Sequence, residues 1–111
     1  MAQAYERAGA RILARNHRSP LGEIDLLVEE AGVLVAVEVK TRTRNAAGEF
    51  PCGSPAESVT PPRLLRLARS LEAVAASIAV APASRRIDVA EVVVDANRQL
   101  LDLTILRDVT S

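Results

Sequence analysis

The sequence predicts a single α/β domain, residues 1–111, with a mixed central β-sheet flanked by helices. Three observations indicate this class. Residues 22–40 alternate apolar and polar side chains with a period of two on either side of a short turn, which is typical of a β-hairpin. Residues 60–78 carry an apolar stripe with helical spacing, and two further strand patterns follow. The predicted order is helix, three strands, helix and two strands.

The first two elements are a short helix and a strand. Residues 2–8 suit the last turns of a helix, and Gly9 is placed to end it as the residue after the C-cap. Residues 11–18 hold an apolar pair among polar side chains, and we place the first strand there. A turn at residues 19–22, marked by proline and glycine, leads into the hairpin.

The hairpin is the centre of the predicted fold. If its turn lies at residues 31–32, Asp25 faces Glu38 and Glu23 faces Lys40. Residues opposed across an antiparallel pair project from the same side of the sheet, so these four polar side chains share one face. The opposite face carries only apolar side chains and is predicted to be the core face (Ile24, Leu26, Val28, Val35, Val37 and Val39).

The second half of the chain is predicted to contain a long connection, a helix and two strands. Residues 41–59 are irregular, and we expect a mobile flap over the adjoining site, because connections of this length are usually functional or disordered. Thr60 is the candidate N-cap of the helix, whose first turn contains two prolines. Two strands, at residues 87–94 and 100–106, enclose a turn at residues 95–98. The apolar stripe of the helix has six members (Leu64, Leu67, Leu71, Val74, Ala75 and Ile78).

Composition narrows the classes of function. With 49% hydrophobic and 25% charged residues, the chain resembles an ordinary globular protein. Its formal net charge is zero, so local basic clusters would have to hold a nucleic acid. Tyr5 and Phe50 are its only aromatic residues, which disfavours a base-stacking surface for single strands. The lone Cys52 excludes an intrachain disulfide, and no apolar run suits a membrane span. We expect a cytoplasmic protein with no membrane partner.

The opposed acids Asp25 and Glu38 require an explanation. Two carboxylates about 5 Å apart repel each other by ~3 kcal/mol at an effective dielectric constant of ~20. The repulsion is relieved if one acid is protonated, if both lie in open water, or if a divalent cation binds between them. Oxygen ligands from carboxylates suit Mg²⁺ or Mn²⁺. Lys40, the only lysine among the 14 lysine and arginine residues, shares their face.

These residues are the parts that metal-assisted hydrolysis of a phosphodiester needs. Alternating charges on a strand usually indicate a solvated face. We nevertheless favour a metal site, because solubility alone would not oppose two acids or retain a single lysine in an arginine-rich chain.

The same residues resemble a known family. Residues 22–27 (GEIDLL) and 37–42 (VEVKTR) are similar to the Asp…Glu-x-Lys signature of the PD-(D/E)XK nuclease superfamily. More narrowly, the chain resembles the bacterial UPF0102 (YraN-like) proteins over about residues 6–106. Three further blocks match in order (residues 11–16, 53–61 and 86–89).

The resemblance implies a restriction-endonuclease-like core and metal-dependent cleavage of nucleic acid, with DNA favoured over RNA. Asp25 and Glu38 would be catalytic ligands of Mg²⁺ or Mn²⁺. The backbone carbonyl of Val39 would be a further metal ligand, and Lys40 a catalytic residue that supports the attacking water or the transition state. Glu23 is either a metal ligand or a residue that orients the ligands, or it forms an ion pair with Lys40, which we slightly favour.

Several other charged residues are candidates for phosphate contacts or ion pairs. Arg42 continues the face of the acids and either contacts a phosphate or is solvated. Arg63 and Arg66 on the predicted helix are candidate nucleic-acid contacts, although a solvated helix face is favoured. For Arg15, on the first strand, a solvated edge is likewise favoured over a phosphate contact. Asp88 is expected to pair with a neighbouring arginine, at position 85 or 86, rather than to bind metal.

The sequence leaves two rivals to a nuclease. One is a non-catalytic module that retains the nuclease fold and binds nucleic acid or a partner. The zero net charge favours it. So does the start of the chain, since family members usually have a longer first helix with a glutamate that joins the metal site, which we expect this chain to lack. The other rival is an assembly partner; a homodimer is one option.

Overall fold

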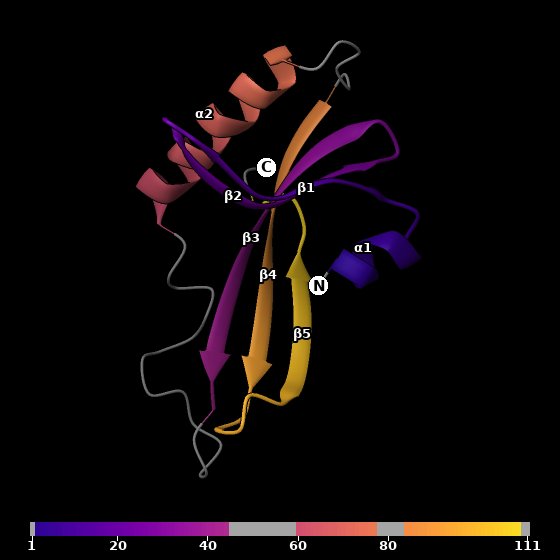
Figure 1. The fold of residues 1–111 in the computed structure, drawn as a ribbon, viewed down its shortest axis with the longest axis vertical. Coiled ribbons are helices and arrows are strands. Elements are labelled where there is room, and N and C mark those ends of the chain that lie inside the picture. The colour runs from indigo at the N-terminus through magenta and orange to yellow at the C-terminus, as the bar shows by residue number, and fades with distance from the viewer. Residues whose placement is uncertain (1, 45–59, 78–83, 110–111) are drawn as a thin grey trace.

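The computed structural model describes residues 2–44, 60–77 and 84–109 (Figure 1). Its elements follow the predicted order of helix, three strands, helix and two strands. They are α1 (Ala2–Arg7), β1 (Arg11–Ser19), β2 (Gly22–Glu30), β3 (Val33–Thr43), α2 (Pro61–Ser77), β4 (Ser84–Val94) and β5 (Leu100–Leu106). Most of the expected flap, residues 45–59, and Ile78 of the predicted apolar stripe lie outside the described residues.

The five strands form one mixed sheet in the order β1-β2-β3-β4-β5. The pairs β1–β2, β2–β3 and β4–β5 are antiparallel, whereas β3 and β4 are parallel. Parallel neighbours require a crossover, and α2 lies in the connection between β3 and β4. The two helices lie on opposite sides of the sheet (Figure 1). The chain therefore has the predicted α/β fold with a mixed central sheet, as expected of a restriction-endonuclease-like core.

The helix ends follow the predicted signals. Gly9 ends α1 with a φ of 92°, and the N–H of Ala10 donates to the carbonyl of Tyr5 at 2.9 Å, so an orphan carbonyl of the last turn is satisfied. Thr60 precedes α2, and its hydroxyl accepts a long hydrogen bond of 3.4 Å from the N–H of Arg63. This cap fixes the backbone from which the Arg63 side chain departs. Neither of these two helices of the described chain is long and apolar enough to cross a membrane.

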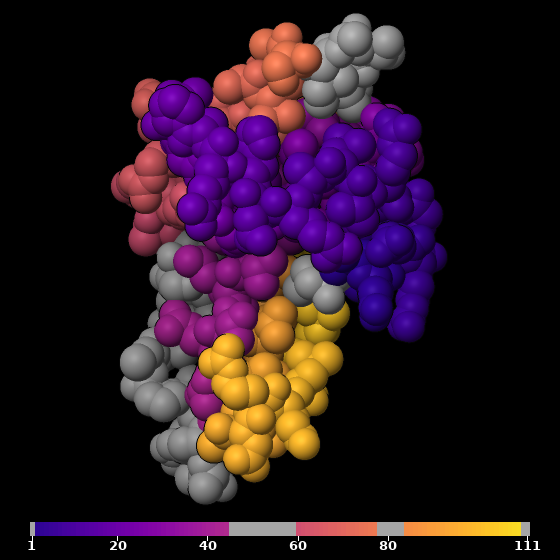
Figure 2. Space-filling model, in the orientation of Figure 1, coloured from indigo at the N-terminus to yellow at the C-terminus, as the bar shows by residue number. Residues whose placement is uncertain are grey.

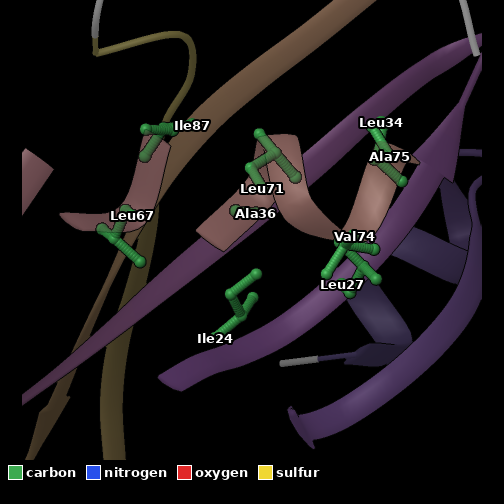
Figure 3. Packing of buried hydrophobic residues seen from close by; sticks show 9 residues of the cluster. All are labelled: Ile24, Leu27, Leu34, Ala36, Leu67, Leu71, Val74, Ala75 and Ile87. Carbon is green, nitrogen blue, oxygen red and sulfur yellow. The ribbon is translucent and has the colours of Figure 1, made fainter. Parts of the chain in front are cut away.

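Two buried clusters hold the sheet between the helices. One lies under α2 and consists of Ile24, Leu27, Leu34, Ala36, Leu67, Leu71, Val74, Ala75 and Ile87 (Figure 3). The other lies under α1 and consists of Ala2, Tyr5, Ala10, Leu26, Val28, Val35, Val37 and Ala90. Because successive strand residues point to opposite faces, the hairpin is buried on both sides.

This arrangement corrects two expectations about the hairpin. The face predicted to carry the acids belongs to the core as well, because Leu27 and Ala36 on that face are buried under α2. Ile24 also belongs to the α2 cluster rather than to the predicted core face with Leu26. The reason is that the ladder between β2 and β3 ends at Leu26. The start of β2 is therefore not paired with β3, and it packs against α2. A Cβ built on Gly22 would lie 3.4 Å from Ser70 Oγ of α2.

The two parallel strands are longer than predicted. β3 continues to Thr43, where the sequence suggested an irregular connection from residue 41 onward, and β4 starts at Ser84 rather than at Ile87. Their ladder is continuous from the pair Val33 and Ser84 onward. The two strands pair through their backbones, so the pairing leaves no trace in the local apolar pattern.

The two ends of the sheet differ in exposure. In Figure 2 the N-terminal residues, in indigo and violet, cover one end of the molecule, and the orange and yellow residues of β4 and β5 form the other. β5 is an edge strand on which Leu100 and Leu101 are exposed. On β3, residues 34–38 are buried and the following residues are not. Glu38 therefore lies at the boundary between core and surface.

The hairpin turn provides a test of the register. Ala31 and Gly32 have φ values of 51° and 79°, which is the pattern of a type I′ turn. A residue other than glycine or asparagine costs about 1 kcal/mol of folding stability in this left-handed backbone conformation. We therefore expect Ala31→Asn to raise the free energy of unfolding by about 0.5–1 kcal/mol in urea denaturation. Ala31→Val should lower it; an asparagine variant no more stable than the parent would contradict this turn.

A buried carboxylate ties α1 and the C-terminal segment to β4. Asp88 is fully buried and accepts hydrogen bonds from the Tyr5 hydroxyl (2.8 Å), Arg86 Nε (2.9 Å) and the N–H of Asp108 (2.9 Å). Burial raises the pKa of the Tyr5 hydroxyl far above its usual range, and Asp88 raises it further. The predicted pairing of Asp88 with a neighbouring arginine is confirmed. Its contacts satisfy a buried charge, which is a structural role.

Glu30 extends this cluster and makes stability depend on pH. Its Oε1 accepts from Arg86 at 3.0 Å and from Arg107 at 2.6 Å. Burial raises the pKa of Glu30, but the two guanidinium groups outweigh it and hold this pKa below the usual 4.5. A depressed folded-state pKa gives stability that is present above the unfolded pKa and lost as pH falls through the folded one.

We therefore expect Glu30→Gln to be less stable than the parent by about 1 kcal/mol at neutral pH, and this difference to vanish below about pH 3–4. Urea denaturation between pH 3 and pH 7 measures it. Glu29→Gln is the matched control, since Glu29 only meets the exposed Arg11 at 3.4 Å. A gap between Glu30→Gln and the parent that is constant over this pH range would refute the assignment.

Candidate active site

The two predicted acids lie where the ladder between β2 and β3 ends. The ladder has the predicted register, with its last pair at Leu26 and Val37. One residue before this pair, Oδ2 of Asp25 accepts a hydrogen bond of 2.9 Å from the N–H of Val39. A side-chain carboxylate thus takes the place of a backbone partner, and the Asp25 carboxylate is fixed between the two strands.

Glu38 completes the pair. Its carboxyl interacts with that of Asp25 one position beyond the last pair of the ladder, and the residue is only 3% exposed. Burial raises the pKa of the Glu38 carboxyl above its ordinary value; Asp25 raises it further, and Arg63 offsets only part of the rise. The site therefore holds two acids whose repulsion is not fully relieved.

Arg63 is the third member of the site. It lies in the first turn of α2, and its Nε contacts Oε2 of Glu38 while its Nη2 donates to the carbonyl of Glu23 at 3.4 Å. The hydrogen bond with Glu38 raises the pKa of the guanidinium. The sequence favoured a solvated helix face for Arg63, whereas the structure places it against an acid. Residue spacing within the helix could not reveal this, because the contact depends on where α2 docks on the sheet.

Lys40 and Glu23 are the other two charged residues predicted for this site. Lys40 is half-buried on β3, two residues after Glu38, and lies opposite Glu91 of β4. Sequence reasoning missed Glu91 because no local pattern indicates which residue of β4 is aligned with Lys40. The ion pair that the structure records for Glu23 is with Arg18 of β1, at 3.7 Å, rather than the expected pair with Lys40. Such exposed pairs add little stability.

The remaining predicted residues surround this centre. Val39 is half-buried, and its side chain packs against the α1 cluster. Arg42 is half-buried further along β3, opposite Val93, and Arg66 is exposed on α2. Their roles as a metal ligand and as phosphate contacts stay predictions.

A pocket of about 140 Å³ opens beside Asp25. Its polar lining also includes Arg15 and Asn16 of β1, and its apolar lining is Ala2, Leu26 and Val39. Because a water molecule occupies about 30 Å³ in the liquid, the pocket has room for several waters or for an anion of similar size. Arg15 lines this pocket and is exposed, as the sequence favoured, so it adds positive charge here while remaining solvated.

The donor set suits a hard divalent cation. Mg²⁺ is commonly held by one or two carboxylates together with water and substrate oxygens, and Asp25 with Glu38 supplies two. A cation between them would relieve their repulsion, which adds to the larger effect of burial in raising the pKa of Glu38. Within residues 2–44, 60–77 and 84–109, no group of three or more His, Cys, Asp or Glu side chains could hold a metal ion. The candidate centre therefore rests on two acids.

Comparisons with known proteins agree on one family. The family described as "Uncharacterised protein family UPF0102" matches residues 1–92. A UPF0102 protein of Symbiobacterium thermophilum is 43% identical over 91 residues, which cover 82% of this chain and 73% of that protein. One of Moorella thermoacetica is 35% identical over 100 residues, covering 90% and 79%. One of Thermus thermophilus is 48% identical over 62 residues, covering 56% and 51%.

Proposed function

This chain belongs to the UPF0102 family, and on that premise we propose that it is a metal-dependent nuclease of the PD-(D/E)XK type that hydrolyses phosphodiester bonds in nucleic acid. One observation carries the proposal. Asp25, from β2, is bonded to the N–H of Val39, the residue next to Glu38, and interacts with the Glu38 carboxyl, while Lys40 lies two residues further along β3. This is the residue set of the Asp…Glu-x-Lys signature.

In the proposed mechanism, the two acids would hold Mg²⁺ or Mn²⁺, and the carbonyl of Val39 would be a further ligand. Bound there, the cation would act as a Lewis acid toward a phosphoryl oxygen. The N–H of Val39 orients the Asp25 carboxylate through the bond at Oδ2. The ammonium group of Lys40 stabilises the negative charge that develops on the phosphoryl group, or directs the attacking water.

Local basic residues would hold the nucleic acid, because the chain has no net charge. Arg42 on β3 and Arg66 on α2 are the proposed phosphate contacts, and Arg15 adds a cation in the pocket beside Asp25. DNA is the substrate class that we favour over RNA. A homodimer, which would offer two sites to one duplex, is part of the proposal.

The test is a cleavage screen of linear and branched DNA and of RNA with Mg²⁺ or Mn²⁺. We expect at least one substrate to be cut by the parent protein only with metal, and the rate to fall by about 100-fold or more in Lys40→Ala. Cleavage that Lys40→Ala retains in full would contradict the proposed mechanism, since it would come from another site or from a contaminating nuclease.

A second candidate is a non-catalytic module that binds nucleic acid on the same fold. Arg63 favours it, because its contact with Glu38 already compensates one acid without any metal. Such a module should bind nucleic acid equally well in a chelator. It should also give no calorimetric heat with Mn²⁺ that depends on Asp25.

A further inference from the structure

Arg63 and a divalent cation would need the same carboxylate. Arg63 Nε contacts Oε2 of Glu38, and the Glu38 side chain is only 4% exposed. Asp25 also interacts with this carboxylate and accepts a hydrogen bond from the N–H of Val39. A cation that bridges the two acids must therefore approach a group that already has a positively charged partner.

The Arg63 side chain is able to leave this position. It is 23% exposed, whereas the acid it contacts is almost completely enclosed. Its backbone is held independently, because the Arg63 N–H donates to the Thr60 hydroxyl and the N–H of Leu64 to the Thr60 carbonyl at 3.0 Å. Rotation of the long side chain would thus open Glu38 without unwinding α2.

We propose that Arg63 is a positioning residue that competes with the metal for Glu38 and, once displaced, binds a phosphate of the substrate. The inference rests on the proposed nuclease function. It links metal occupancy to substrate binding, since the cation that displaces the guanidinium also sets it free. A planar guanidinium suits this second task, because it binds a phosphate with two parallel hydrogen bonds.

The first experiment titrates metal-stripped protein with Mn²⁺ in a calorimeter. Two cations that compete for one carboxylate are coupled, and couplings of this kind are typically about 5–150-fold. We expect Arg63→Gln to bind Mn²⁺ about 10-fold more tightly than the parent. Arg69→Gln, an exposed arginine of the same helix, is the matched control and should bind like the parent.

The second experiment measures duplex DNA affinity in the cleavage-deficient Lys40→Ala background. With saturating Mg²⁺, adding Arg63→Gln should weaken binding about 5–10-fold, because a phosphate contact is lost. In chelator the same substitution should change nothing, since Glu38 then holds the guanidinium. If Arg63 had only a structural role, Arg63→Gln would weaken DNA binding equally with Mg²⁺ and in chelator.

The outcomes separate this inference from the proposed function. If the parent binds Mn²⁺ in an Asp25-dependent manner and Arg63→Gln binds it equally or more weakly, the competition is refuted and the nuclease proposal stands. If neither protein binds Mn²⁺, both ideas fail. Binding by Arg63→Gln alone would support the competition in its strongest form. Should Arg63→Gln be unfolded without metal, recovery of its helical circular dichroism on adding Mn²⁺ is the supporting result, and no recovery is the overturning one.

Discussion

Replacing Asp25 by asparagine should abolish metal-dependent cleavage and, at the same time, stabilise the fold by about 1 kcal/mol. The asparagine carbonyl can still accept the hydrogen bond from the N–H of Val39, so the local backbone is kept. The neutral side chain, however, no longer repels the buried Glu38 and no longer supplies a charged metal ligand. We expect at least a ~10³-fold loss of cleavage, because metal binding would depend on this carboxylate.

The raised pKa of Glu38 predicts how the stability gain of Asp25→Asn should change with pH. The folded-state pKa of Glu38 is raised, so its favourable contribution is complete below the unfolded pKa and is lost as pH rises through the folded one. Asp25→Asn removes one cause of that rise. Its gain in the urea midpoint should therefore be larger at pH 7 than at about pH 4. Asp102→Asn, exposed on β5, is the control and should show no gain; a destabilised Asp25→Asn would refute the repulsion.

Removal of the Asp88 carboxylate should cause the largest loss of stability. We expect Asp88→Ala to lower the free energy of unfolding by about 3–5 kcal/mol, since the half-buried Arg86 and the buried Tyr5 hydroxyl lose their shared acceptor. A domain of ordinary stability has only about 5–15 kcal/mol in total, so the variant should be close to unfolded at 37 °C.

Thermal and urea denaturation of a graded set test this expectation. Tyr5→Phe removes one hydrogen bond and should cost about 1–2 kcal/mol. Asp88→Asn, which keeps the shape but not the charge, should lie between Tyr5→Phe and Asp88→Ala. Asp102→Ala is the surface control and should stay within about 0.5 kcal/mol of the parent. A loss below about 1 kcal/mol for Asp88→Ala would mean that the cluster does not hold the two segments together.

Local signals predicted most of the fold. The hairpin register followed from alternation and a turn at residues 31–32, and the ends of both helices followed from Gly9 and Thr60. These features depend on neighbours within a few residues, whose steric and hydrogen-bonding preferences are visible in the sequence. The proximity of Asp25 and Glu38 was predicted by extending this register one position beyond its last pair, Leu26 and Val37.

What could not be predicted depends on how distant segments dock. Arg63 reaches Glu38 only because α2 packs across the start of β2, and the same packing draws Ile24 out of its expected face. Glu91 lies beside Lys40 through the alignment of two parallel strands. Such contacts join residues separated by a long connection, and nothing in the nearby sequence specifies the partner.

The Asp88 cluster also bears on synthesis of the chain. The carboxylate receives the Tyr5 hydroxyl from 83 positions earlier and the N–H of Asp108 from 20 positions later. While the chain emerges from the ribosome, the first helix must wait for most of the polypeptide before its anchor exists. The polar anchor of α1 therefore forms late in synthesis, and until then α1 can pack only through its apolar contacts with β2 and β3.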